Sequence, residues 1–342
     1  MCYNDYNCEM LESERGEAAV ETLYGISNWK LTIRRAEDHI EILRGITCDT
    51  HAVLPDELFG LPVTVLGDHA LAPTARPIAG EEVRVVSGRE GEWSNRDLQE
   101  LTLPAGLTAV HNYAFYGCRS LHTLRLHDNV NHWGVDCLMN CHRLSNLHLT
   151  RTGEVQGEAL AYICGAIHEE LDVVLYGTDG TETRLVFPDY MEDYEENFPN
   201  HSFDYHIMGG GYAYHHTFPK KQLILRTYDE HWPQYLRKEH EDETALRLAY
   251  TRLRWPTGLE PFAEQQYVDF LAANAHDAIL WQLSLRDAAG LRLLLDRLNP
   301  DESIISAACA RARVEGNTEG LALLLERQRR NQPKGLDRDF DL

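Results

Sequence analysis

The sequence has few basic residues and no long apolar run, and each absence excludes a class of function. Its 342 residues include 54 acidic and 32 basic side chains, which gives a formal net charge of -22. A chain this acidic repels phosphate backbones and anionic lipid head groups, so we expect neither nucleic acid nor a membrane surface as a partner. No segment approaches the roughly 18 apolar residues that span a bilayer.

The sequence also lacks a cysteine pair with metal or redox spacing, and its start lacks the apolar core of a secretion signal. Residues 1–25 carry several glutamates instead, so we expect a cytoplasmic protein with reduced thiols and no disulfides. The eight cysteines are scattered: Cys2, Cys8, Cys48, Cys118, Cys137, Cys141, Cys164 and Cys309.

What the sequence does contain is an internal repeat. Three Leu-x-x-Leu-x-Leu blocks begin at Leu98, Leu121 and Leu144, at a constant spacing of 23 residues. Apolar positions between the blocks keep the same phase: Leu107 with Val130, Val110 with Trp133, Ala114 with Cys137, Phe115 with Leu138, and Cys118 with Cys141. A period of about 20–29 residues with this pattern is typical of leucine-rich repeats, which form one short strand per coil of a solenoid.

The region before residue 98 predicts an irregular first coil and a cap. Val63, Leu66, Ala70 and Leu71 precede Leu107, Val110, Ala114 and Phe115 by a constant 44 residues. Alternating apolar residues over 28–45 predict a hairpin that turns at 36–38 and covers the apolar end of the array. The strand-like segment 83–86 is interpreted as part of a degenerate further coil, and residues 10–24 as a short acidic helix.

The coil Leu98–Ser120 carries a family resemblance. Leu-Pro follows its strand, and Val-His-Asn-Tyr-Ala-Phe-Tyr-Gly-Cys follows at 110–118. This resembles the BspA-like (Treponema-type) leucine-rich repeat family, and the resemblance covers about residues 28–150. The second coil departs from the family pattern, because Leu126 is followed by His127 rather than proline. The resemblance implies a repeat solenoid that recognises a partner, but the secreted adhesin role of many members is not expected without an export signal.

After Thr150 the period ends. Residues 158–167 predict a capping helix, 171–176 and 183–187 a second hairpin, 206–216 a flexible histidine- and glycine-rich loop, and 223–225 a last strand. Helices are then expected at 244–252, 261–273, 278–285, 288–298, 302–313 and 318–329. Residues 290–297 and 320–327 echo each other and resemble the second helix of ankyrin units, although the Thr-Pro-Leu-His core is missing.

The predicted fold class is therefore α/β, a leucine-rich repeat solenoid with hairpin caps followed by an ankyrin-like helical array. The predicted domains are an acidic N-terminal segment at 1–27, a repeat domain at 28–232, a helical domain at 233–330 and a disordered tail at 331–342.

Two groups of potential metal ligands have more ordinary explanations. Cys137 and Cys141 occupy coil-interior positions, so their proximity to His142 does not indicate a metal or haem site. His206, His215 and His216 have suitable atoms for zinc, but their spacing matches no His-Glu-x-x-His helix. We therefore expect no metal, no cofactor and no catalytic residue. A metal-dependent hydrolase with its site in residues 188–232 remains the alternative.

The favoured function is protein–protein interaction through the outward face of the repeat strands. Alternation directs Leu101 and Leu103 inward, so that Glu100 and Thr102 face outward. Stacked coils then form two polar columns, one of Glu100, Thr123 and Asn146 and the other of Thr102, Arg125 and His148. A competing surface is the acidic, aromatic segment 189–205, and we favour the columns because they lie on paired backbone.

Overall fold

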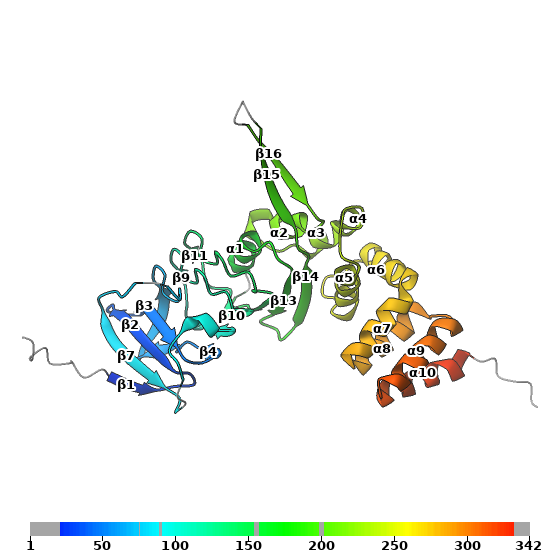
Figure 1. Ribbon diagram of the computed structural model, residues 1–342, viewed down its shortest axis with the longest axis horizontal. Coiled ribbons are helices and arrows are strands. Elements are labelled where there is room, and N and C mark those ends of the chain that lie inside the picture. The colour runs from blue at the N-terminus through cyan, green and yellow to red at the C-terminus, as the bar shows by residue number, and fades with distance from the viewer. Residues whose placement is uncertain (1–20, 75, 89–90, 154–156, 198–201, 332–342) are drawn as a thin grey trace, which may run out of the picture. The chain divides into compact units, whose positions relative to one another are not determined.

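The computed structural model describes residues 21–74, 76–88, 91–153, 157–197 and 202–331 (Figure 1). The chain divides into two compact units, Met1–Arg143 and Leu144–Leu342. The domain limits expected at 27/28 and 232/233 stay predictions.

Most of the expected acidic helix lies outside the described residues, and its end, Glu21–Tyr24, is a strand, β1. The expected tail also lies outside them, beyond Asn331 at the end of the last helix.

The first unit begins with a cap sheet that contains the predicted hairpin. Strands β2 (Trp29–Arg35) and β3 (Ile40–Thr47) pair antiparallel, which confirms the hairpin read from alternation. Trp29, Leu31 and Ile33 are buried, and the indole Nε1 of Trp29 donates to the Val53 carbonyl at 2.8 Å. Next to β3 in this sheet comes β6 (Leu61–Leu66), which also pairs with the short β5 (Glu57–Leu58).

The segment 83–86 does not form a further coil, so that interpretation was wrong. It belongs to β7 (Glu81–Val86), which pairs antiparallel with β2 and parallel with β1. Val83 and Val85 are buried, whereas Glu82 and Arg84 are exposed. The alternation is that of a strand with one buried face, and this face completes the cap sheet rather than the repeat.

The repeat spacing reappears as strand register. In one sheet β4 (His51–Val53), β8 (Glu100–Thr102) and β10 (Thr123–His127) run parallel, with Leu101 opposite Leu124. In the cap sheet, β9 (Ala109–Val110) lies between β6 and β11 (His132–Trp133). Leu66 pairs with Val110 and Val110 with Trp133, so both offsets found in the sequence are the offsets of hydrogen-bonded neighbours.

Backbone conformation repeats with the same period. His69, Tyr113 and Asp136 occupy corresponding positions and all adopt positive φ, at 53°, 56° and 51°. Gly117 and Asn140 form a second corresponding pair with φ of 74° and 65°. Asparagine is one of the few residues other than glycine that tolerate this left-handed region, so the coil geometry survives the replacement of glycine. A 3-10 turn, η1 (Asn95–Asp97), precedes the first regular coil.

The second unit begins with the strands β12 (Asn146–Thr150), β13 (Leu171–Tyr176) and β14 (Glu182–Phe187). β12 and β13 are parallel, while β13 and β14 form the predicted hairpin. The predicted capping helix is present as α1 (Ala159–Ala166), with Leu160 and Ile163 buried. A separate two-stranded sheet follows, made of β15 (Met191–Asn197) and β16 (Ser202–Met208).

The expected flexible loop at 206–216 is instead the end of β16 and a short helix, α2 (Tyr212–His216). Its three glycines permit close packing. A Cβ on Gly210 would lie 2.3 Å from the Tyr235 ring, and one on Gly211 would lie 1.9 Å from the Pro188 carbonyl oxygen. The strand expected at 223–225 is also absent, because Leu225 begins α3 (Leu225–Glu230).

Helix α4 (Trp232–Tyr235) was not predicted. The helices that follow it agree with the sequence pattern: α5 (Asp242–Arg254), α6 (Pro261–Ala273), α7 (Ala275–Leu285), α8 (Ala288–Leu298), α9 (Glu302–Val314) and α10 (Thr318–Asn331). A 3-10 turn, η2 (Pro219–Lys221), precedes α3. Helix α7 packs on α8 and α9, and α10 packs on α8 and α9. The sequence similarity between residues 290–297 and 320–327 extends to their helix caps. Asp287 and Asn317 accept the backbone N–H groups of Gly290 and Gly320 at corresponding positions. Their assignment as ankyrin-like stays a prediction.

Candidate interaction surface

The two predicted columns begin on neighbouring strands of the first unit. Glu100 lies opposite Thr123, and Thr102 lies opposite Arg125. The Arg125 guanidinium approaches the Glu100 carboxylate diagonally, at 3.5 Å, and the two side chains are 41% and 32% exposed. An exposed pair of this kind contributes at most about 1 kcal/mol to folding, so both groups are free to exchange partners.

The sequence analysis missed a third charged or polar side chain beside Glu100 and Arg125. His51, on β4, lies opposite Glu100, and its Nε2 is 3.5 Å from Glu100 Oε1. The histidine side chain is 60% exposed. A signal was available, because Leu54-Pro55 repeats the Leu103-Pro104 that follows β8, which identifies residues 51–53 as a repeat strand. Glu100 therefore lies between His51 and Arg125, and we call these three residues the strand-face row.

Thr123 does not lie on an accessible surface, which corrects its place in the first column. Its residue is only 5% exposed, and its hydroxyl lies 2.8 Å from Nδ1 of His122. The Thr123 hydroxyl is therefore both buried and engaged within the chain. The inward residues follow the prediction, since Leu101 and Leu124 are fully buried and Leu103 is 2% exposed.

The last member of each column lies in the second unit, on β12. Asn146 and His148 are both half-buried. Nδ1 of His148 lies 3.1 Å from the Tyr176 hydroxyl, and the two rings stack with centroids 6.0 Å apart. Asn146 pairs in register with Asp172 of β13.

Helix α5 borders this part of the second unit. Arg247 of α5 forms ion pairs with both Glu170 and Asp172, and α5 packs on β14. Burial raises the pKa of Asp172, although the charge of Arg247 opposes the shift. The outward face of β13 is therefore partly occupied by the chain's own helix, which leaves Asn146 and His148 beside an engaged acidic group.

Cys137 and Cys141 line the coil interior, as the repeat phase indicated. Both are buried, and their thiols donate to the carbonyls of Gly134 at 3.1 Å and Phe115 at 3.2 Å. Burial raises the pKa of the Cys118 thiol at the corresponding position of the preceding coil. All three thiols are buried core groups that pack as small apolar side chains do.

The histidines of the proposed hydrolase alternative lie in three different environments. His215 is fully buried, and its Nδ1 donates to the Cys164 carbonyl at 2.9 Å. His216 Nε2 lies 2.7 Å from the Tyr190 hydroxyl, and His206 is exposed on β16 opposite Asp193. Within the described ranges, no group of three or more His, Cys, Asp or Glu side chains is placed to hold a metal ion. No observation specifically favours the hydrolase.

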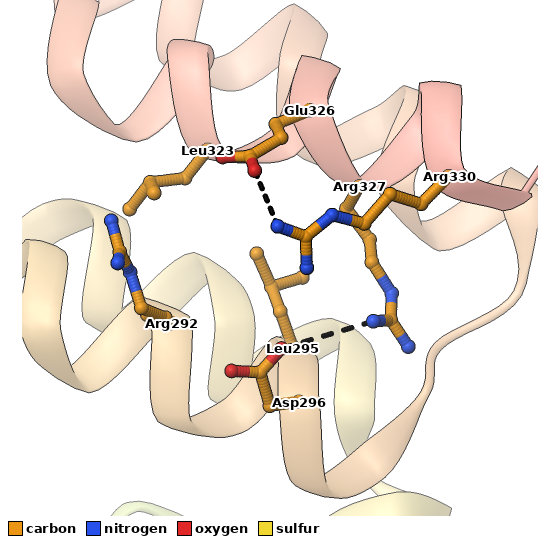
Figure 2. A pocket seen from close by; sticks show the side chains of 7 residues that line it. All are labelled: Arg292, Leu295, Asp296, Leu323, Glu326, Arg327 and Arg330. Carbon is orange, nitrogen blue, oxygen red and sulfur yellow. Dashed lines mark hydrogen bonds and ion pairs between the residues drawn. The ribbon is translucent and has the colours of Figure 1, made fainter.

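A hollow between α8 and α10 is another surface feature with converging charges (Figure 2). Its lining is Arg292, Leu295, Asp296, Leu323, Glu326, Arg327 and Arg330. Arg330 pairs with Glu326 at 2.5 Å, and Arg327 lies 3.8 Å from Asp296. The hollow measures about 120 Å³, well below the roughly 300–1,000 Å³ typical of ligand pockets. It is a gap between paired helices, with charges that largely satisfy one another.

Comparison with known proteins identifies the repeat region. Residues 89–169 match the family model of the BspA type leucine rich repeat region, which confirms the resemblance seen in the repeat residues. No curated protein and no solved structure matches the chain. Among the described helices, none is long and apolar enough to cross a membrane.

Proposed function

We propose that this chain is a non-catalytic interaction protein whose repeat region binds a protein partner through the outward face of its strands. The observation that carries the proposal is the strand-face row. It places an imidazole, a carboxylate and a guanidinium side by side on three parallel strands, all at least about one third exposed.

The row is suited to binding because its backbone is already ordered. Register pairing fixes β4, β8 and β10, so a partner loses little additional entropy when it docks. Arginine is enriched among residues that contribute most to interfaces, and Arg125 ends the row. Mixed charge orients a partner rather than merely attracting it. Thr102 completes the proposed surface within the first unit, and Thr123 is excluded by its burial.

The proposal is tested by quantitative affinity purification from the source cells with the full chain as bait. Arg125→Ala is compared with Arg119→Ala, which removes the same charge from an exposed position outside the strand. A protein enriched by the wild type and by Arg119→Ala, but lost with Arg125→Ala, is expected.

The protein recovered is then titrated against each variant. We expect Arg125→Ala to weaken binding at least about tenfold, because loss of an interface arginine that contributes strongly costs more than about 1 kcal/mol. Equal affinity for the wild type and for a His51→Ala/Arg125→Ala double variant would contradict the proposed face.

A further inference from the structure

The second unit carries a hairpin that joins neither of the larger sheets. Strands β15 and β16 pair with each other, from Met191 opposite Met208 to Asn197 opposite Ser202, and with no other strand of the described residues. The hairpin projects from the rest of its unit (Figure 1). An isolated two-stranded hairpin is marginally stable in water, so its base and its exposed faces require an explanation.

The base of the hairpin is firmly packed. Tyr190, just before β15, is 5% exposed and contacts the rings of Tyr212 and His216 with centroids 5.3 Å and 5.4 Å away. Its hydroxyl bonds to His216, and the Gly211 N–H donates to the Asp189 carbonyl at 3.2 Å. These contacts anchor the hairpin where β15 begins.

One face of the hairpin presents tyrosines around a carboxylate. Alternation places Glu192 and Tyr194 on the same face, and register places Tyr205 opposite Tyr194. Their rings lie 5.2 Å apart, and the two tyrosines are 63% and 47% exposed. The Tyr194 hydroxyl lies 3.5 Å from Glu192 Oε2, and a bond from the Tyr205 hydroxyl to the same carboxylate raises the pKa of Tyr205. We call Glu192, Tyr194 and Tyr205 the tyrosine face.

The surroundings are acidic as well. From Pro188 to Pro219 the chain has six carboxylates and neither lysine nor arginine. Two residues before β15, Asp189 lines a hollow of about 320 Å³ together with four glutamates: Glu169, Glu170, Glu241 and Glu243. The one basic group of that lining, Arg247, is already bound to Glu170 and Asp172.

We propose that the tyrosine face binds a basic, extended segment of a protein partner. A guanidinium or ammonium above an exposed tyrosine ring is attracted by its π electrons, and Glu192 supplies the counter-charge beside it. The unpaired edges of the hairpin offer backbone groups to an extended chain. The same acidity repels nucleic acid, anionic lipid and a second copy of this chain.

The test uses the full chain and a synthetic peptide with arginine at alternate positions, titrated by fluorescence anisotropy. The same peptide with citrulline in place of arginine keeps the shape and removes the charge. Glu192→Gln and Asp193→Asn form a matched pair, because they remove one charge each from adjacent residues on opposite faces.

We expect Glu192→Gln and Tyr194→Ala/Tyr205→Ala each to weaken binding about tenfold, and Asp193→Asn to weaken it less than about threefold. The citrulline peptide is expected not to bind. Arg125→Ala should bind the arginine peptide as the wild type does, since the strand-face row is a separate surface.

Three results would overturn the proposal. Equal losses for Glu192→Gln and Asp193→Asn would indicate diffuse attraction rather than a face. Undiminished binding by the tyrosine double variant, shown by its thermal unfolding to be folded, would remove the aromatic contribution. A concentration-dependent dimer of the wild type that the tyrosine double variant abolishes would identify a second copy as the occupant.

Discussion

His215 shows how a single residue acquires a role that the sequence does not display. It stands in a histidine-rich stretch that resembles a set of metal ligands, yet it is fully buried, with its ring edge-on to Phe187 and Tyr190. Burial lowers its pKa, although its bonds to backbone carbonyls oppose the shift. Neutral imidazole is therefore the form that fits the folded second unit.

This shift predicts a loss of stability in mild acid. Below the ordinary histidine pKa of about 6.5, the unfolded chain takes up a proton that folded His215 does not, so the free energy of unfolding falls as pH decreases. One such group contributes at most about 1.4 kcal/mol per pH unit. Urea unfolding between about pH 7.5 and 5.5 should show a smaller decrease for His215→Gln than for the wild type. An identical pH slope in both proteins would argue against the role given to this residue.

At the scale of elements, the repeat region was predictable because its period is imposed by geometry. Residues at the same phase become hydrogen-bonded neighbours, so the offsets of 23 and 44 in the sequence reappear as the registers of β8 with β10 and β6 with β9. The spacing of apolar residues likewise predicted the C-terminal helices, and the similar segments 290–297 and 320–327 have matching caps in the structure.

Elements that depend on distant partners were not predictable in the same way. Strand β7 resembles a coil strand locally, and only its pairing with β2 and β1 assigns it to the cap. The Gly209–Gly211 run is typical of flexible loops, but here it allows the chain to pass close to Pro188 and Tyr235. Thr123 follows the outward phase and is nevertheless buried, with its hydroxyl bonded to His122, which strand alternation cannot reveal.

Strand β10 gives a direct test of the inward and outward assignments. Leu124 is fully buried opposite Leu101, so Leu124→Ala should lower the free energy of unfolding by about 2–5 kcal/mol through lost burial and a residual cavity. The adjacent Arg125→Ala should change it by no more than about 1 kcal/mol, because its ion pair is exposed. Chemical denaturation measures both, and a similar loss for the two variants would contradict the register.

At the scale of the whole molecule, the helical array is packed onto the end of the repeat region within the second unit. Arg252 of α5 forms a bidentate pair with Asp229 of α3, and both side chains are almost completely buried. The Tyr267 hydroxyl of α6 donates to the same carboxylate at 2.9 Å. Burial of such a pair is tolerated because every charge is matched, and removal of one partner leaves an unpaired charge in the interior. Helix α5 also packs on β14, and the Tyr228 hydroxyl of α3 donates to the Val186 carbonyl at 2.6 Å, so the sheet and the helices share one core within this unit.

Buried cysteines in both units pack as core side chains, which predicts that folding requires neither a metal nor a disulfide. Of the six described cysteines, five are buried and Cys48 is half-buried. Cys118 and Cys164 have pKa values raised by burial, so their thiols resist both oxidation and metal binding.

Thermal unfolding should therefore be unchanged by a chelator or by a reductant, each tested separately against untreated protein. Elemental analysis of the purified chain provides the independent control. A stoichiometric metal, together with a lower midpoint after chelation, would contradict this account of the core and restore the hydrolase alternative in residues 188–232.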